Sequence, residues 1–270
     1  MGYIEAVVLA VIQGLTEFLP VSSSGHLVMA QHWFGQFSEE NLLYDVMLHM
    51  ATVTAILLYF WQDLLTLGKG YVGLPTEPGS MFQGCERQTI HYVLLASVPT
   101  AIIGLGVQSI GIETLAQPSL VSVMFLVTGG ILWGTRGGTS ARTAKEMRPW
   151  DALLIGIIQG AAVFPGISRS GSTIAGGIIL GLDRELAARF SLLISMPAIV
   201  GATLLELVKV LGETHDSLEV YLVGMGVAAV VGYWSIGVIL RLVRHNHFYL
   251  FSYYLWPLGM SILLWGIFNS

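Results

Sequence analysis

The chain has 270 residues, of which 54% are hydrophobic and only 11% are charged, and its formal net charge is −5. Soluble domains carry about 25% charged residues, so this composition excludes an ordinary soluble protein and indicates an integral membrane protein. The long, unbroken apolar runs favour helices over a β-barrel, whose strands would alternate polar and apolar residues. A single cysteine, Cys85, excludes an intramolecular disulfide. We expect membrane lipids as partners and no nucleic acid.

Eight apolar runs predict the helices, and in chain order they cover residues 4–18, 42–61, 89–107, 118–135, 151–164, 186–210, 217–241 and 248–268. A transmembrane helix needs roughly 20 apolar residues, so the first and fifth runs are too short to cross. Each of them ends at a proline that is followed by serines and glycines. We therefore predict that each is the descending half of a re-entrant element, with ascending halves at residues 22–34 and 169–182.

The predicted fold is an all-α integral membrane protein with six full transmembrane helices and two re-entrant helix–loop–helix elements. Three full crossings separate the two elements, and an odd number means that they enter from opposite faces, as an inverted-topology repeat. The whole chain forms one membrane domain. Its predicted parts are repeat one at 1–135 with a re-entrant element at 4–34, a linker at 136–149, and repeat two at 150–270 with a re-entrant element at 151–182.

The loop charges predict the orientation in the membrane. Of the 12 Lys and Arg residues, only Lys209 falls on the side that carries both termini, while Arg169 lies within the second re-entrant element. Positively charged loops stay cytoplasmic, so the linker faces the cytoplasm and both termini face outward. The outward loops at 35–41, 108–117 and 211–216 carry acidic residues instead. Because the N-terminus lacks a basic segment and a small-residue cleavage site, we expect the first apolar run to remain in the mature protein.

Two stretches inside the re-entrant elements resemble each other. Residues 13–26 align without a gap on residues 159–172, with an offset of 146 throughout. The copies share a Gln, a Gly, a Phe, two serines and the following Gly, and Ser23 is the equivalent of Arg169. An internal repeat of interrupted apolar segments is typical of a membrane site built at a repeat interface. We therefore expect the two motif loops to meet.

Each ascending half would present the N-terminus of a helix, with unpaired N–H groups and the positive end of the helix dipole. Serines at such a position either cap the helix or leave the N–H groups free for an anion. Arg169 adds a permanent positive charge that suits phosphate oxygens. The motif loops thus predict a phosphate cradle. Its predicted substrate-binding residues are Ser22, Ser24, Gly25, Ser168, Ser170 and Gly171.

Glu17 is out of place beside such a cradle unless it has a specific role. It could hold a divalent cation, act as a general base or orient His26. A structural ion pair with Arg169 is the alternative. Gln13 and His49 lie in apolar segments, where a hydrogen bond between helices or a packing role is also open.

At these residues the chain resembles the undecaprenyl-diphosphate phosphatase family of bacteria, the bacitracin-resistance type. The first motif of that family is Glu or Gln, three residues, then Glu, leading into Phe-Leu-Pro-Val-Ser-Ser-x-Gly-His, and it stands here at residues 13–26. The second motif, Pro-Gly-x-Ser-Arg-Ser-Gly, stands at residues 165–171. The resemblance covers nearly the whole chain. The position at which the family has Glu or Gln is Gln13 in this chain. This weakens any mechanism that needs two carboxylates on the metal ion and makes Glu17 the more important residue.

The resemblance implies removal of one phosphate from undecaprenyl diphosphate, which recycles the lipid carrier for cell-wall synthesis and confers bacitracin resistance. It implies dependence on Mg²⁺ or Ca²⁺, a multi-pass protein of the bacterial plasma (inner) membrane, and a site that opens on the outer, periplasmic face. Glu17 and Gln13 would hold the metal. The predicted catalytic residues are Glu17, Ser23, His26 and Arg169.

Several alternatives remain open at this point. We favour Ser23 as the nucleophile with His26 as a proton shuttle, against a phosphohistidine at His26 or direct attack by water. A lipid-phosphate flippase is the strongest rival to the enzyme, because inverted repeats with broken helices are typical of transporters. The type-2 phosphatidic acid phosphatase superfamily also has Ser-Gly-His and Ser-Arg motifs, but its Lys-x6-Arg-Pro opening is missing here. Glycine-rich faces would permit a homodimer.

Overall fold

The structure is a computed structural model that describes residues 2–34, 42–76, 79–109, 117–137, 141–210 and 218–269. The described residues form helices joined by turns, with one isolated β-bridge between Arg142 and Leu182. The α-helices are α1 (Tyr3–Thr16), α2 (Ser23–Phe34), α3 (Leu42–Tyr59), α4 (Trp61–Tyr71), α5 (Glu86–Gln108), α7 (Pro118–Trp133), α8 (Pro149–Ala161), α9 (Arg169–Ile179), α10 (Arg184–Val210), α11 (Leu218–Arg244) and α12 (Ser252–Asn269). The short 3₁₀ helices are η2 (Gly134–Gly137), η3 (Ala144–Glu146) and η4 (Phe248–Phe251).

The chain is a multi-pass helical membrane protein. By length and hydropathy, five helical segments among the described residues could cross a membrane, and a sixth does so if the bent pair α3 and α4 is counted as one span. The five are built on α5, α7, α10, α11 and α12. The predicted crossing over residues 42–61 falls on α3, which counts as a crossing only together with α4, and the chain bends by 72° between these two helices.

Residues at the bend between α3 and α4 contact α10. Phe60 leaves the helical conformation with φ −98° and ψ 18°, and its buried ring lies 5.5 Å from the guanidinium carbon of Arg189. Asp63, in the first turn of α4, pairs with Arg189 and accepts a hydrogen bond from Ser80 at 3.1 Å. The loop implied at residues 62–88 is therefore partly helix, and an ion pair ties it to α10.

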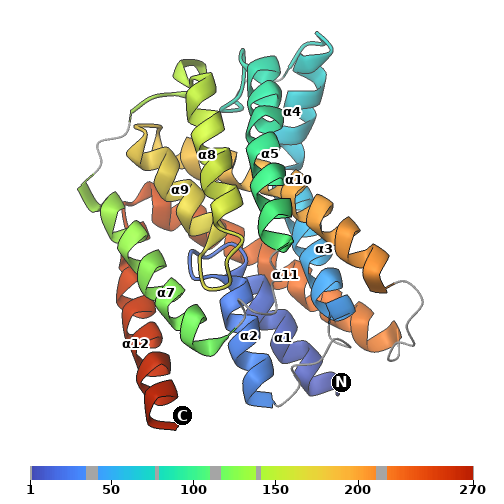
Figure 1. Cartoon of the computed structure of the whole chain (residues 1–270). Coiled ribbons are helices and arrows are strands. Elements are labelled where there is room, and N and C mark those ends of the chain that lie inside the picture. The colour runs from blue at the N-terminus through green and yellow to red at the C-terminus, as the bar shows by residue number, and fades with distance from the viewer. Residues whose placement is uncertain are drawn as a thin grey trace.

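The short helices form two pairs that approach the middle of the molecule from opposite ends. In Figure 1, α1 and α2 lie in the lower half, α8 and α9 lie in the upper half, and each pair turns back near the middle. α1 packs on α11, whereas α8 packs on α5. Both chain termini lie at the lower end (Figure 1). The segments that join the helices of the two pairs therefore face each other inside the bundle.

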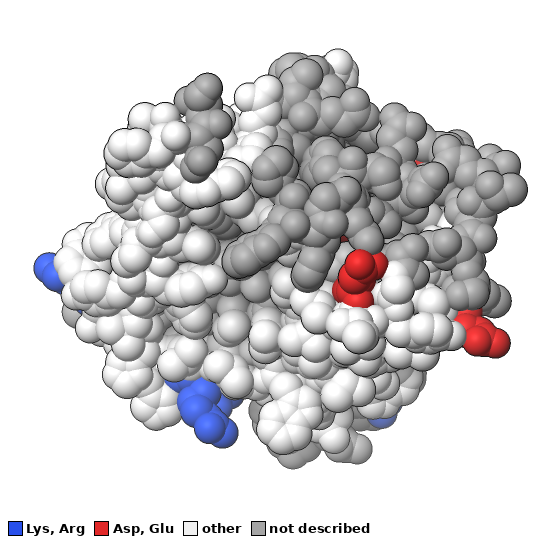
Figure 2. Space-filling model, turned by 90° about the horizontal axis from the view of Figure 1, so that it is seen from below, with Lys and Arg blue, Asp and Glu red and all other residues white. Residues whose placement is uncertain are grey.

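The lower end of the molecule carries few charges among the described residues. Seen from below, acidic side chains stand on a largely uncharged surface, and Lys and Arg show only toward its edges (Figure 2). At the upper end, by contrast, Arg142 pairs with Asp151 at the start of α8 with an N–O distance of 2.8 Å. The acidic loops expected at 35–41 and 211–216, and most of 108–117, lie outside the described residues.

Glycines set how closely the paired helices approach their neighbours. A Cβ atom at Gly14 would lie 2.8 Å from the carbonyl oxygen of Ala228 in α11, and one at the equivalent Gly160 would lie 2.8 Å from Cβ of Ile103 in α5. Such small residues let helix backbones pack closely in membranes. Among the described glycines of α1, α2, α8 and α9, the closest approach is at Gly156, where a Cβ would lie 2.2 Å from the carbonyl oxygen of Ala96.

We expect Gly156→Ala to destabilise the fold, because the added methyl group would collide with the backbone of α5. Overpacking of this kind lowers the free energy of unfolding by typically 1–3 kcal/mol. Gly106→Ala is the matched control, since a Cβ there would meet nothing within 4 Å. The measurement is the free energy of unfolding in mixed detergent micelles. Equal stabilities of the two variants would contradict the close contact between α5 and α8.

Candidate active site

The two motif loops contact each other directly. The first loop joins α1 to α2 and the second joins α8 to α9. The backbone N–H of Gly166 donates to Oγ of Ser22 at 3.1 Å, and Oγ of Ser170 donates to the carbonyl of Leu19 at 3.3 Å. Two segments that are about half the chain apart are thus joined by hydrogen bonds, as their sequence similarity predicts.

Equivalent serines cap the two helices that start at these loops. Oγ of Ser22 accepts a hydrogen bond from the N–H of Gly25 at 3.3 Å, and Oγ of Ser168 accepts one from the N–H of Gly171 at 3.0 Å. Ser22 adopts φ +71° to make this turn. These four residues, which the sequence assigns to substrate binding, therefore shape the starts of α2 and α9 in this structure.

The remaining hydroxyls and amides of the cradle lie beside the caps. Oγ of Ser24 is 3.4 Å from Oγ of Ser22, and Oγ of Ser170 is 3.3 Å from Oγ of Ser168. The first-turn N–H groups, those of Ser23 and Ser24 in α2 and their equivalents in α9, have no acceptor within their own helices. Two sets of amides that can bind an anion are thus present where the loops meet.

Glu17 lies at the centre of the site and links both copies of the motif. One of its carboxylate oxygens, Oε1, forms an ion pair with Arg169. The other, Oε2, accepts hydrogen bonds from Oγ of Ser23 at 2.6 Å and from Nε2 of Gln13 at 3.0 Å. The Glu17 side chain is only 2% exposed and that of Arg169 is 21% exposed. Glu17 is therefore in direct contact with two of the other three predicted catalytic residues, Ser23 and Arg169.

His26, the fourth, is directed away from this cluster. Its Nδ1 lies 2.8 Å from the carbonyl oxygen of Ser22 and must donate there, so Nε2 accepts the hydrogen bond from the hydroxyl of Tyr254 at 2.8 Å. The ring also packs against Phe125, with 5.1 Å between centroids. The hydroxyl of Ser23 is bonded to Glu17 and not to His26. The favoured pairing of Ser23 with His26 as a proton shuttle is therefore not the arrangement in this structure.

His49, for which the sequence leaves a hydrogen bond or a packing role open, is a neighbour of the site. Nε2 of His49 lies 3.9 Å from Oε2 of Glu17, and Nδ1 donates to the carbonyl of Asp45 at 2.7 Å. The His49 side chain is 30% exposed. The available signal was a titratable side chain in the middle of an apolar helix, which in a membrane protein indicates a functional site by default. Tyr254, which holds His26, carried no such signal.

The donor atoms around Glu17 suit a hard divalent cation. Oε1 of Gln13 is buried without a hydrogen-bond partner, and it lies on the side chain that contacts Glu17. Mg²⁺ and Ca²⁺ prefer carboxylate and amide oxygens, and Mg²⁺ is often held by one or two carboxylates together with substrate phosphates. No group of three or more His, Cys, Asp or Glu residues that could hold a metal occurs among the described residues. A cation here would thus need oxygen atoms of water or phosphate to complete its shell.

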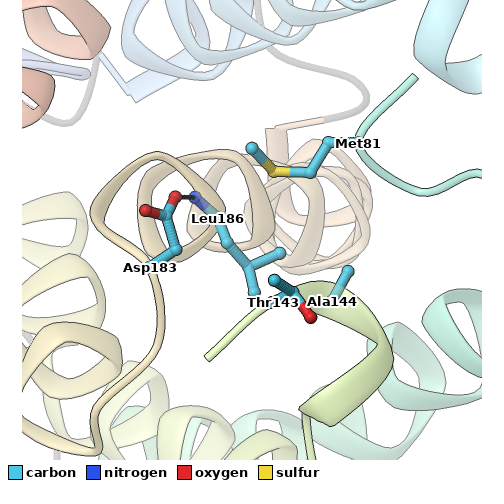
Figure 3. Close-up of a pocket in the computed structure, with 5 residues that line it drawn as sticks. All are labelled: Met81, Thr143, Ala144, Asp183 and Leu186. Carbon is cyan, nitrogen blue, oxygen red and sulfur yellow. Dashed lines mark hydrogen bonds between the residues drawn. The ribbon is translucent and has the colours of Figure 1, made fainter. Parts of the chain in front are cut away.

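Two cavities of the structure lie away from this site. One, of about 160 Å³, is lined by Met81, Thr143, Ala144, Asp183 and Leu186 (Figure 3). The carboxylate of Asp183 is turned toward the start of α10, where it accepts hydrogen bonds from the N–H groups of Glu185 at 3.0 Å and Leu186 at 3.1 Å. It acts as a helix cap and is not free for chemistry. The second cavity, of about 510 Å³, lies along α11.

Fold and site together define a multi-pass helical membrane protein with a buried carboxylate, a serine and an arginine where two broken helices meet. The model of the family described as Bacitracin resistance protein BacA matches residues 6–261, and the chain belongs to this family. It is 46% identical to the undecaprenyl-diphosphatase of Desulfosudis oleivorans over 98% of each chain. It is 40% identical to that of Syntrophotalea carbinolica, over 96% of this chain and 97% of the other. The family predicted from the two motifs is thereby confirmed.

Proposed function

We propose that this protein hydrolyses undecaprenyl diphosphate to undecaprenyl phosphate and inorganic phosphate. The observation that carries the proposal is the direct contact of Glu17 with both Ser23 and Arg169, at two helix N-termini that can bind phosphate. Relatives that match nearly the full length of the chain bear the name of this phosphatase. The rival reading as a lipid-phosphate flippase is therefore not favoured. The product is the lipid carrier used in cell-wall synthesis.

The residues divide the chemistry as follows. Arg169 and the first-turn amides of α2 and α9 hold the diphosphate, and Arg169 stabilises the charge that develops on the transferred phosphoryl group. Glu17, which already accepts the hydrogen bond from Ser23, takes the hydroxyl proton. Oγ of Ser23 then bonds to the terminal phosphorus while the anhydride P–O bond breaks and undecaprenyl phosphate leaves with the proton from Glu17. Water then attacks the phosphorus of the phosphoserine and gives a proton to Glu17, and the P–Oγ bond breaks as Glu17 returns that proton to Oγ of Ser23 and inorganic phosphate leaves.

A divalent cation, Mg²⁺ or Ca²⁺, fits the oxygen atoms of Glu17 and Gln13. When bound, it would neutralise charge on the phosphate oxygens. Binding of the substrate would also draw Arg169 partly away from Glu17, because both phosphate and carboxylate compete for its guanidinium. In this proposal, Arg169 pairs with Glu17 while no substrate is bound and contacts the diphosphate after binding.

The location that fits this function is the bacterial plasma membrane, with the site open to the periplasmic face. The support is the distribution of Lys and Arg, which are concentrated in the segments assigned to the cytoplasm. Six crossings and two re-entrant elements as an inverted repeat remain our proposal for the arrangement in the membrane. Its support is the pair of short helices at each end of the molecule (Figure 1). A homodimer stays a prediction.

The nucleophile can be tested with Ser23→Ala and a matched control, Ser24→Ala. Both serines lie in the first turn of α2, but only the hydroxyl of Ser23 contacts Glu17. We expect Ser23→Ala to lower phosphate release from undecaprenyl diphosphate by about 10³-fold or more, since it removes the attacking atom. Ser24→Ala removes a predicted substrate-binding hydroxyl but not the attacking atom, so it should lower phosphate release by no more than about tenfold.

Acid quenching during turnover, followed by mass spectrometry, identifies the attacking group. Phosphate on Ser23 is the expected result. Phosphate on His26 would show that His26, and not Ser23, is the nucleophile. An active Ser23→Ala variant with no phosphorylated residue would indicate direct attack by water. A folded wild-type protein that binds the lipid and releases no phosphate would overturn the enzymatic function itself.

We expect His49→Phe to lower kcat about tenfold with little change in KM, because it removes the nitrogen that faces Oε2 of Glu17 and keeps the ring volume. Neighbours that orient a functional group typically contribute 10–100-fold. The pH–rate profile should change as well, which loss of packing alone would not cause. His91→Phe on the exposed face of α5 is the matched control. Wild-type kcat and an unchanged pH profile in His49→Phe would show that His49 only packs.

A further inference from the structure

The larger cavity is a groove along α11, separate from the site around Glu17. Its volume is about 510 Å³, which falls within the range of small-molecule sites, about 300–1,000 Å³. Tyr59 at the end of α3 forms one wall, and residues of α11 form the rest together with His245, which follows the last residue of α11. The lining includes none of the predicted site residues. The groove is therefore a second candidate binding site that the proposed reaction does not use.

The groove changes from apolar to basic along one face of α11. Trp234, Val238, Arg241 and His245 line it and follow each other at intervals of four, three and four residues, so they share one helix face. At a rise of 1.5 Å per residue, this face extends over roughly 16 Å. Trp234 is 73% exposed and Val238 is 46% exposed. This order matches an amphiphile with an apolar chain and an anionic head.

The charge at the basic end is not fully balanced by the protein. Arg244 pairs with Glu185. Arg241 takes part in none of the ion pairs of the part of the chain that the structure describes. The groove lining contains no carboxylate. A cation or metal ion is therefore a poor match for the groove, and a single phosphate group is a good one.

We propose that this groove binds an anionic glycerophospholipid of the surrounding membrane. Its phosphate would contact Arg241, and its acyl chains would lie along Val238 and Trp234. Basic pockets between membrane helices are general binding sites for anionic lipid headgroups, and an aromatic residue beside them suits the membrane interface. The exposed wall opens sideways to the bilayer, where glycerophospholipids are the abundant ligands. The groove also lacks the carboxylate and serine that distinguish the site for undecaprenyl diphosphate.

Gly237 offers a direct way to fill the groove. A Cβ atom there would lie 3.7 Å from the hydroxyl oxygen of Tyr59, an ordinary contact, so a larger side chain can be added without a backbone clash. Gly237→Leu would place its side chain between Tyr59 and α11. Gly226→Leu on the same helix is the matched control, because a Cβ at Gly226 meets nothing within 4 Å and Gly226 does not line the groove.

The test is native mass spectrometry of the purified full-length protein, titrated with phosphatidylglycerol and with zwitterionic phosphatidylcholine. We expect Gly237→Leu to lower the affinity for phosphatidylglycerol at least fivefold and Gly226→Leu to leave it unchanged. Arg241→Gln should lower it about fivefold, since a basic residue near a lipid surface contributes about 1 kcal/mol. Arg136→Gln, at an exposed arginine outside the groove, should have no effect. Phosphate release should be unchanged in all four variants.

Three results would overturn the proposal. The first is equal affinity of the wild-type protein for the two phospholipids, and the second is equal affinity of Arg241→Gln and Arg136→Gln for phosphatidylglycerol. The third is tighter binding of undecaprenyl phosphate than of phosphatidylglycerol, lost in Arg241→Gln, because the occupant would then be the product of the reaction. If Gly237→Leu does not fold, the two arginine variants still decide the outcome.

Discussion

Glu17→Gln is expected to lower phosphate release from undecaprenyl diphosphate by about 10²- to 10⁴-fold, the range that a general base typically contributes. The amide has nearly the same shape as the carboxylate, but it cannot take the proton of Ser23. In the wild type, the Glu17 carboxylate accepts a hydrogen bond from Oγ of Ser23 at 2.6 Å. The variant also leaves the guanidinium of Arg169 without its anionic partner. Steady-state phosphate release by detergent-purified protein, with Mg²⁺ and with chelator, measures the effect.

Glu206→Gln is the matched control for this variant, because Glu206 lies in α10 and contacts no residue of the site among the described interactions. It should keep full activity. If the rate of phosphate release by Glu17→Gln stays within a few fold of the wild-type rate, Glu17 is only a structural partner of Arg169. That outcome would also remove the reason to place a metal ion at Glu17 and Gln13.

The second large effect concerns stability. Glu17→Ala and Arg169→Ala are each expected to lower the free energy of unfolding by about 3–5 kcal/mol, because removal of one partner leaves an uncompensated charge in a buried site. The Glu17 side chain is only 2% exposed, so water cannot readily take the place of Arg169. The double variant should lose clearly less than the sum of the two single losses. Unfolding in mixed detergent micelles measures all three values.

The coupling free energy of this double-mutant cycle is the decisive quantity. A coupling of more than about 2 kcal/mol would confirm a strong buried ion pair. Strictly additive losses would show that Glu17 and Arg169 act independently of each other. A matched exposed pair is available in Arg244 and Glu185, where the Arg244 side chain is 49% exposed and a coupling below about 1 kcal/mol is expected.

The centre of the site could be predicted from the sequence because the repeat relates backbone positions. The alignment makes Ser23 and Arg169 equivalent, and in the structure both residues begin a helix and both contact Glu17. Short apolar runs that end at a proline also identified the breaks after α1 and α8. These features depend on local sequence and on symmetry, and both can be read from a single chain.

Other features depend on tertiary contacts that have no local signal. The orientation of His26 is set by Tyr254, which is 228 residues away, and His49 reaches Glu17 only because α3 packs beside α1. The 72° bend after α3 likewise lies beside an ion pair with α10 that no local signal indicates. Side-chain partners of this kind are decided by packing between helices, so the sequence could not predict them.

The capping serines have a consequence for how the two halves of the chain have diverged. Ser22 and Ser168 perform the same task in both copies, whereas the residues that follow them, Ser23 and Arg169, have opposite chemistry. The shared part of the motif forms the same helix start in both halves, and in the proposed mechanism the variable part would give attack on phosphorus to one half and charge neutralisation to the other. Fragments cut within the linker at 136–149 would each carry half of the machinery, so their activity in a cell would report on reassembly by complementation.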